Sequence, residues 1–296
     1  MACSGDGMKL DATIGVLGAR SFVGAEVLRR LGNDNVVVYA YSRSPMESDT
    51  ASVRWILWDG CCTGEVASNI PLWVSALPIW TLPAFFPLLE RCGIKRLVAL
   101  SSTSRFTKIS SADASERALA ENLAQAESCL TDWAEARDVK WFILRPTLIY
   151  GSGRDKNISE IARVIRRTGF FPILGAGKGL RQPIRSTDVA EALIRALNVE
   201  GLDSQALNIT GGETLGYKEI VRRVFVAYGM HPRFLTVPVW FFKLAIVCAR
   251  ISPKYRNLKP EMALRMNQDL VFDGSPAERM LGFKAAGLCL RAEDLP

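Results

Sequence analysis

A glycine-rich turn directly after the first apolar run is the feature that most constrains this chain. Residues Thr13–Leu17 form an aliphatic segment of strand length, and Gly18–Gly24 follow it at once. Residues Ala25–Leu31 then have the apolar spacing of a helix, with Gly32 as its stop signal. Glycines in such a strand–turn–helix unit let the backbone approach a pyrophosphate, whose charge lies at the helix N-terminus. The pattern therefore predicts a phosphate-binding turn.

Strand-length apolar runs alternate with helix-period segments through the first half of the chain, as βαβ units require. The expected strands are Thr13–Leu17, Val36–Tyr41, Val53–Leu57, Leu72–Ala76, Leu97–Leu100 and Trp141–Leu144. The expected helices are Ala25–Leu31, Leu82–Cys92 and Ser115–Arg137. The alternation predicts an α/β fold with a Rossmann-type doubly wound parallel sheet, and we assign residues 1–150 to this NAD(P)-binding domain.

Beyond Gly151 the pattern changes to helices separated by glycine-rich turns. The helical patterns cover Ile158–Thr168, Thr187–Asn198 and Lys218–Tyr228. Residues 151–296 are therefore expected to form a smaller, mostly helical substrate lobe. The strand-like stretch Ala206–Ile209 is a candidate to return to the sheet, so the boundary is not sharp.

Composition limits the partners and the compartment. The net charge of +7 favours an anionic partner, but the basic residues never form a long block, so we expect an anionic small molecule or membrane surface and no nucleic acid. Seven cysteines without a CxxC pair predict reduced thiols, and with His231 as the single histidine we expect no metal site. Residues 1–9 do not resemble a secretory signal, which predicts a cytoplasmic protein. Residues 70–89 are uncharged but contain four prolines, which argue against a membrane span.

Several segments resemble the extended and atypical short-chain dehydrogenase/reductase superfamily, in particular NAD(P)-dependent epimerase/dehydratase-like members. Residues 17–24 are similar to the TGxxGxxG motif, with Ser21 in place of the middle glycine. The resemblance then follows the chain through Asp59, residues 76–78, residues 101–103, residues 144–151, residues 181–190 and residues 208–213. The order and spacing of these segments carry the resemblance.

The resemblance implies a set of cofactor-binding residues. They are Gly18, Arg20, Ser21, Phe22, Val23, Gly24, Arg43, Asp59, Ala76, Leu77, Pro78, Ser101 and Pro146. It also places Thr103 where the family keeps its catalytic serine or threonine, and Arg181 where an arginine binds a sugar-nucleotide phosphate. Each residue also has a local explanation, because Asp59 could begin a turn and Thr103 could cap the segment after it.

The residues after the second expected strand indicate which dinucleotide is bound. NAD-binding proteins usually place an acidic residue there for the ribose 2′-hydroxyl, and none is present. Arg43, helped by Arg20, would instead meet the 2′-phosphate of NADP, so we expect NADP in preference to NAD. The alternative is that Arg43 is a solvated loop charge.

One departure from the family concerns the proton donor. The family's Tyr-x-x-x-Lys is absent from the expected cofactor domain, since Leu119 and Leu123 occupy the two aligned positions and no tyrosine lies between Tyr41 and Tyr150. Residues 255–259 spell the motif but lie far beyond that domain, and we interpret this match as chance. General acid–base catalysis typically contributes 10² to 10⁴ in rate, so ordinary keto/alcohol redox chemistry is in doubt. Thr103 and Tyr150 are the candidate replacements.

Two functions from different classes remain. One is an NADP-dependent oxidoreductase or epimerase/dehydratase-like enzyme that acts on an anionic small molecule such as a sugar nucleotide. The other is a non-catalytic NADP-binding redox-sensing or assembly subunit, docked through residues 237–251. That segment carries two charges, Lys243 and Arg250, and is expected to be a helix. It is either part of the core or an interfacial helix that contacts a membrane periphery or a second copy of the chain.

Overall fold

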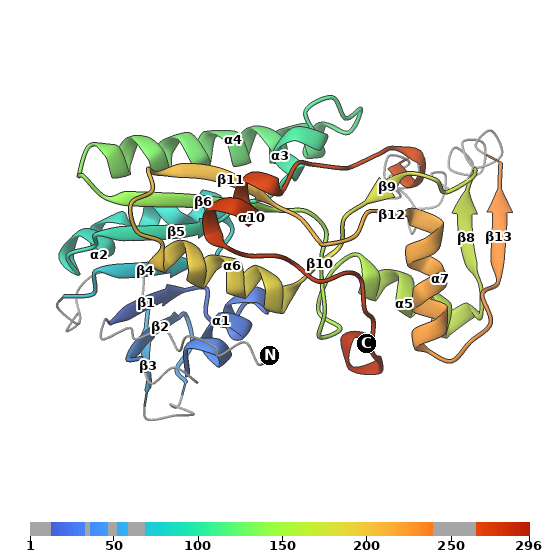
Figure 1. Cartoon of the computed structure of the whole chain (residues 1–296), viewed down its shortest axis with the longest axis horizontal. Helices are drawn as coiled ribbons and strands as arrows, with labels where there is room; N and C mark the ends of the chain where they lie inside the picture. The colour runs from blue at the N-terminus through green and yellow to red at the C-terminus, as the bar shows by residue number, and fades with distance from the viewer. Residues whose placement is uncertain (1–12, 33–35, 47–51, 59–68, 239–264) are drawn as a thin grey trace.

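A seven-stranded parallel sheet forms the centre of the protein (Figure 1). The computed structural model describes residues 13–32, 36–46, 52–58, 69–238 and 265–296. The strands are ordered β11-β6-β5-β4-β1-β2-β3. Their bounds are Ile14–Leu17 (β1), Val38–Ser42 (β2), Val53–Leu57 (β3), Leu72–Ser75 (β4), Arg96–Leu100 (β5), Lys140–Pro146 (β6) and Gln205–Ile209 (β11). This is the predicted doubly wound sheet, with β11 returning from the second half of the chain to pair with β6.

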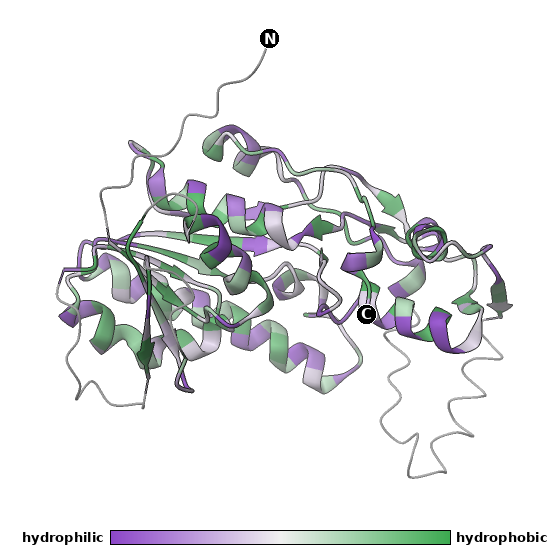
Figure 2. Cartoon of the chain, turned by 90° about the horizontal axis from the view of Figure 1, so that it is seen from below, coloured by the Kyte–Doolittle hydropathy of each residue, from purple (hydrophilic) through white to green (hydrophobic). Residues whose placement is uncertain are grey.

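Helices cover both faces of this sheet. One face carries α1 (Phe22–Gly32), α6 (Ser186–Asn198) and α10 (Ser275–Leu281), and the other carries a 3₁₀ helix η1 (Ile79–Phe85), α2 (Phe86–Arg91) and α4 (Ala114–Glu135). Strand residues alternate between the two cores: Val74 of β4 packs with α1 and α6, whereas Trp73 packs with η1 and α4. Figure 2 shows the resulting hydrophobic strands between helices of mixed character.

The prediction of one continuous helix over Leu82–Cys92 is wrong, because the structure divides this segment into η1 and α2. Pro83 lies inside η1, where it cannot donate a backbone hydrogen bond, and Pro87 lies in the first turn of α2. Proline fits the first turn of an α-helix but interrupts its interior. The segment therefore changes its helix type and restarts.

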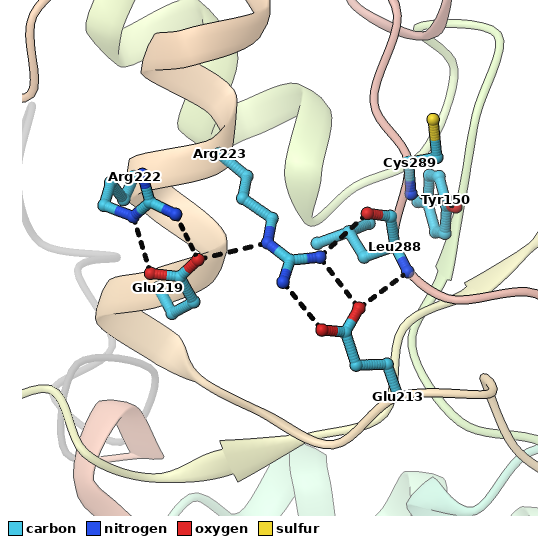
Figure 3. Close-up of polar contacts among 7 residues, drawn as sticks. All are labelled: Tyr150, Glu213, Glu219, Arg222, Arg223, Leu288 and Cys289. Carbon is cyan, nitrogen blue, oxygen red and sulfur yellow. Dashed lines mark hydrogen bonds and ion pairs between the residues drawn. The ribbon is translucent and has the colours of Figure 1, made fainter.

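The lobe at the right of Figure 1 has a separate core around α5 (Ile158–Thr168) and α7 (Tyr217–Ala227). Three short strand pairs border it: β7 (Ile149–Tyr150) with β10 (Ile184–Arg185), β9 (Leu180–Arg181) with β12 (Leu215–Gly216), and β8 (Phe171–Leu174) with β13 (Phe234–Val237). The remaining elements are α3 (Ser104–Thr107), η3 (Arg265–Asn267) and η4 (Ala292–Asp294). In Figure 3, Arg223 of α7 donates to Glu213, Glu219 and the carbonyl of Leu288, which fastens the C-terminal segment to the lobe.

The segment expected to form an interfacial helix, residues 237–251, is described only at its first two residues. Val237 ends β13, paired with Leu174, so no helix begins there. Residues 239–251 lie outside the described residues. Among the helices that the structure describes, none is long and apolar enough to span a membrane.

Candidate functional site

The turn after β1 is built so closely that it requires glycine at two positions. Gly18 has a φ of +72°, and a Cβ there would lie 2.8 Å from backbone atoms of Ala76 and Leu77. A Cβ on Gly24 would lie 2.1 Å from the carbonyl oxygen of Gly18. The turn is therefore packed against the segment after β4, and the predicted residues Gly18, Gly24, Ala76 and Leu77 are brought together at one edge of the sheet.

Ser21 caps the helix that begins at this turn. Its Oγ accepts a hydrogen bond from the amide of Gly24 at 3.0 Å, which is the arrangement of a helix N-cap. Among the described residues, the amides of Phe22 and Val23 have no acceptor. The start of α1 therefore presents two open N–H donors and the positive end of a helix dipole, which suits a phosphate group. Serine at this position serves the helix itself.

Two exposed arginines flank this turn. Leu17 pairs with Tyr41 across β1 and β2, so both strands end side by side. Arg43 follows β2 directly and Arg20 lies in the turn, and both side chains are exposed. The two guanidinium groups are thus available at the carboxyl edge of the sheet. Asp59, the expected adenine contact, lies outside the described residues.

Ser101 belongs to a buried polar network. Its Oγ donates to Oε1 of Glu127 at 2.5 Å, and Glu127 also binds Arg145 and Arg105. Glu127 is 2% exposed, and burial of a carboxylate is tolerated when two guanidinium groups neutralise it. The Ser101 side chain therefore ties β5 to α4.

Thr103 has its hydroxyl held in a defined direction. Oγ1 donates to the carbonyl oxygen of Pro146 at 3.0 Å, and the amide of Thr103 donates to the same oxygen. The side chain is buried yet lines the main cavity. Because the hydroxyl proton is already donated, the oxygen of Thr103 can act toward a ligand as a hydrogen-bond acceptor.

Tyr150 occupies a different environment from the one that a proton donor needs. It is 1% exposed, its hydroxyl accepts a hydrogen bond from the amide of Cys289 at 3.4 Å (Figure 3), and it is not among the residues that line the cavity. Burial raises its pKa to about 12. These contacts do not favour the predicted proton transfer by Tyr150.

The main cavity, with a volume of about 960 Å³, reaches from the glycine turn into the lobe. On the sheet side it is lined by Phe22, Thr103 and Lys108, and on the lobe side by Arg154, Arg181 and Tyr217. The predicted cofactor turn, the predicted catalytic threonine and the predicted substrate arginine therefore share one cavity.

Arg181 is a buried cation at the lobe end of this cavity. It is 6% exposed, and its guanidinium donates to the carbonyl oxygens of Leu180, Gln268 and Arg265 at 2.5 to 2.7 Å. Burial lowers its pKa to about 10. Among the described residues no carboxylate forms an ion pair with it; carbonyl oxygens accept its hydrogen bonds, and Asp269 acts on it only at longer range. Such a group favours an incoming anion.

Tyr217, which the sequence did not single out, lines the cavity beside Arg181. The guanidinium carbon of Arg181 lies 6.0 Å from the centre of the Tyr217 ring. Burial raises the pKa of Tyr217 to about 12, so the phenol remains a hydrogen-bond donor at neutral pH. Tyr217 directly precedes the expected helix Lys218–Tyr228 and begins α7 in the structure, but only packing shows that it meets Arg181.

Leu119 and Leu123 lie on α4 and pack into the core between this helix and the sheet. Within the described part of the chain, no cluster of histidine, cysteine and acidic residues could hold a metal ion. The candidate site therefore consists of a glycine turn, one oriented hydroxyl and several cations.

Comparisons with known proteins agree with this architecture. Residues 85–210 match the model of the NAD dependent epimerase/dehydratase family. The solved structure of MoeE5 in complex with UDP-glucose and NAD superposes with a TM-score of 0.67 at 23% identity, and the alignment covers 95% of each chain. Residues 85–210 are thus similar to this epimerase/dehydratase family, and the chain shares the fold of the solved structure.

Two curated proteins that are similar to this chain differ in their described roles. It is 22% identical over 121 residues to the UDP-glucose 4-epimerase of Vibrio cholerae. It is 25% identical over 150 residues to NADH dehydrogenase [ubiquinone] 1 alpha subcomplex subunit 9, mitochondrial, of Arabidopsis thaliana. The matches cover 41% and 50% of this chain, but only 37% and 35% of the two relatives. Little more than a third of each relative is therefore spanned.

Proposed function

We propose that this protein binds a nicotinamide dinucleotide at the turn between β1 and α1 and a sugar nucleotide at the lobe end of the main cavity. It would act as an oxidoreductase or epimerase/dehydratase-like enzyme. The observation that carries the proposal is the shared cavity, which is lined by Phe22 and Thr103 on the sheet side and by Arg181 on the lobe side. A substrate phosphate bound to Arg181 would extend its sugar toward Thr103.

The residues at the turn suit the dinucleotide. Gly18 and Gly24 permit the close approach of backbone segments, and the open amides of Phe22 and Val23 suit a pyrophosphate. We propose NADP in preference to NAD, because exposed Arg20 and Arg43 flank the turn and can pair with a 2′-phosphate. When bound, a nicotinamide cofactor supplies hydride transfer. The chain's own part is to bind, orient and exclude water.

At the reacting end, Thr103 would accept a hydrogen bond from a substrate hydroxyl. Its own proton is donated to Pro146, which fixes the direction of the oxygen's lone pairs. At the other end, Arg181 and Tyr217 would donate to phosphate oxygens. This arrangement positions a substrate without requiring a metal ligand.

A second candidate is a non-catalytic NADP-binding sensor or assembly subunit. It is favoured by leucine at positions 119 and 123, whose side chains pack in the core and have no proton to exchange. The similarity to a protein named as a subunit of the NADH dehydrogenase [ubiquinone] 1 alpha subcomplex is also compatible with it.

Cofactor cycling separates the two candidates. Purified protein should bind NADP and UDP-glucose in calorimetry, and the absorbance of bound NADP at the nicotinamide band should change when UDP-sugars are added. Tight NADP binding without any change in cofactor redox state across a panel of sugar nucleotides would favour the sensor or assembly subunit. Absence of dinucleotide binding would refute both.

A further inference from the structure

The loop that joins β7 to α5 is held in an uncommon backbone conformation. Gly151, Ser152 and Gly153 have φ values of 125°, 54° and 63°, so three consecutive residues lie at positive φ. Serine rarely adopts this conformation, and it persists only where surrounding contacts enforce it. Here the amide of Gly153 donates to the carbonyl oxygen of Asp294 at 3.0 Å.

The other side of the loop is fixed as well. Asp155 is buried, and its carboxylate accepts hydrogen bonds from the amides of Asn157 and Ser159 at 2.9 and 3.1 Å and from the Ser159 hydroxyl at 2.6 Å. These bonds anchor the start of α5. The backbone of Arg154, between Gly153 and Asp155, is therefore positioned before any ligand arrives.

Arg154 reaches from this loop to the glycine turn of the other half of the molecule. Its Nη2 donates to the carbonyl oxygen of Arg20 at 3.1 Å, across 134 positions of sequence. The same side chain lines the main cavity together with Phe22. A guanidinium carries five N–H donors, and this bond uses one of them. Several donors therefore remain beside the turn.

The surroundings of this guanidinium favour an anion. Glu26 is the acidic residue of the described segment 13–32, and its carboxylate binds Arg29 further along α1. The open amides of Phe22 and Val23 lie at the start of α1. Arg154 contacts the turn that directly precedes this helix. The Arg154 guanidinium, two open amides and a helix N-terminus thus lie beside the same turn.

We propose that Arg154, a residue of the lobe, contacts the pyrophosphate of the dinucleotide at the glycine turn. This inference rests on the proposed function, because it assumes that the turn binds a dinucleotide. Arg154 would then be a cofactor-binding residue from outside the Rossmann sheet. Binding of the cofactor would link the loop at 151–154 to the start of α1.

The test is calorimetry with ADP-ribose, which carries the pyrophosphate without the nicotinamide, and with UDP as a probe of the lobe end. Arg154→Met should weaken ADP-ribose about 10- to 100-fold, the usual range for one charge-assisted hydrogen-bond donor, and change UDP affinity less than twofold. Arg154→Lys should give an intermediate loss. Arg222→Met is the matched control, since Arg222 is exposed on α7 and pairs with Glu219; it should leave both affinities unchanged.

The outcomes are distinct. An Arg154→Met protein that folds and binds ADP-ribose as the wild type does would overturn the inference and leave the proposed function standing. A loss for UDP but not for ADP-ribose would assign Arg154 to the substrate phosphate and would also overturn it. Wild-type protein that binds neither ADP-ribose nor NADP would refute the proposed function together with this inference.

Discussion

The two ends of the main cavity differ in whether backbone groups or side chains form them. The end at α1 is built mainly from backbone, namely two glycines without side chains, two open amides and a helix dipole, to which Arg154 adds a guanidinium. The end in the lobe consists of side chains, with Arg181 and Tyr217 held in place by packing and by carbonyl oxygens. The backbone site depends on glycines, because a Cβ atom at these positions would clash with neighbouring backbone. The side-chain site depends on charge and hydrogen-bond donors. Substitutions should therefore affect the two ends independently and in different ways.

The largest effect is expected at Gly18. Gly18→Ala would place a Cβ 2.8 Å from the backbone of Ala76 and Leu77 at a φ of +72°. We expect ADP-ribose affinity to fall at least about 100-fold through this clash and strain, with UDP affinity retained. Gly93→Ala is the control, because Gly93 has a φ of +69° but nothing within 4 Å of its Cβ position. Equal losses in both variants would show that backbone strain alone, and not the close approach, explains the effect.

The next effect is expected at the opposite end. Arg181→Met should weaken UDP by about 10- to 100-fold, because a buried cation without a described ion-pair partner is a strong phosphate ligand. ADP-ribose affinity should not change. The thermal midpoint is measured in parallel, since three carbonyl oxygens lose a donor. Unchanged UDP affinity in a folded variant would remove Arg181 from the site.

A smaller effect on NADP affinity is expected at Arg43, which we propose to pair with the 2′-phosphate. Arg43→Ala should weaken NADP by about tenfold and leave NAD unchanged, because the exposed guanidinium can pair only with the additional phosphate. Arg54→Ala is a suitable control, since Arg54 is exposed on the neighbouring strand and donates to the Tyr39 hydroxyl. Equal NAD and NADP affinities in the wild type would contradict the proposed preference.

The smallest effect is expected at Tyr217. Tyr217→Phe should weaken UDP by about three- to tenfold, the value of one hydrogen bond, whereas Tyr228→Phe, directly after the same helix, should not. The phenol donates only while protonated, and its pKa is raised from 10 to about 12. Its contribution should therefore stay constant from pH 7 to 10 and disappear as the pH rises toward 12. Loss of the contribution already below pH 10 would mean that the phenol is not buried as described.

The fold could be predicted from the sequence wherever a pattern is long enough. Six strands of the sheet and the helices α1, α4, α5, α6 and α7 have clear apolar periods, and residues 206–209 were a candidate to return to the sheet, where β11 pairs with β6. The strands of the lobe were not predicted: β7, β9, β10 and β12 have two residues each and carry no period, and β8 and β13 have four. Their pairing depends on contacts across 30 or more positions.

The site could be predicted only in part, for a related reason. The glycine turn is a local pattern, so consecutive residues of the sequence are enough to predict it. Arg154 and Tyr217 carry no local signal, because their roles depend on residues 134 and 36 positions away, Arg20 and Arg181. The roles of Ser101 and Tyr150 also depend on distant partners, Glu127 and Cys289.

The C-terminal segment described above also bears on how the chain acquires its structure during synthesis. The last strand of the sheet ends at Ile209. The loop at 151–154 beside the glycine turn is nevertheless held by the backbone carbonyl of Asp294, whose carboxylate also binds Arg185. A ribosome that has released the whole sheet still has to translate more than eighty residues before this brace exists. The nascent protein would pass through a stage with a finished sheet and an unbraced cavity wall. Translation pauses after residue 209 would prolong that stage.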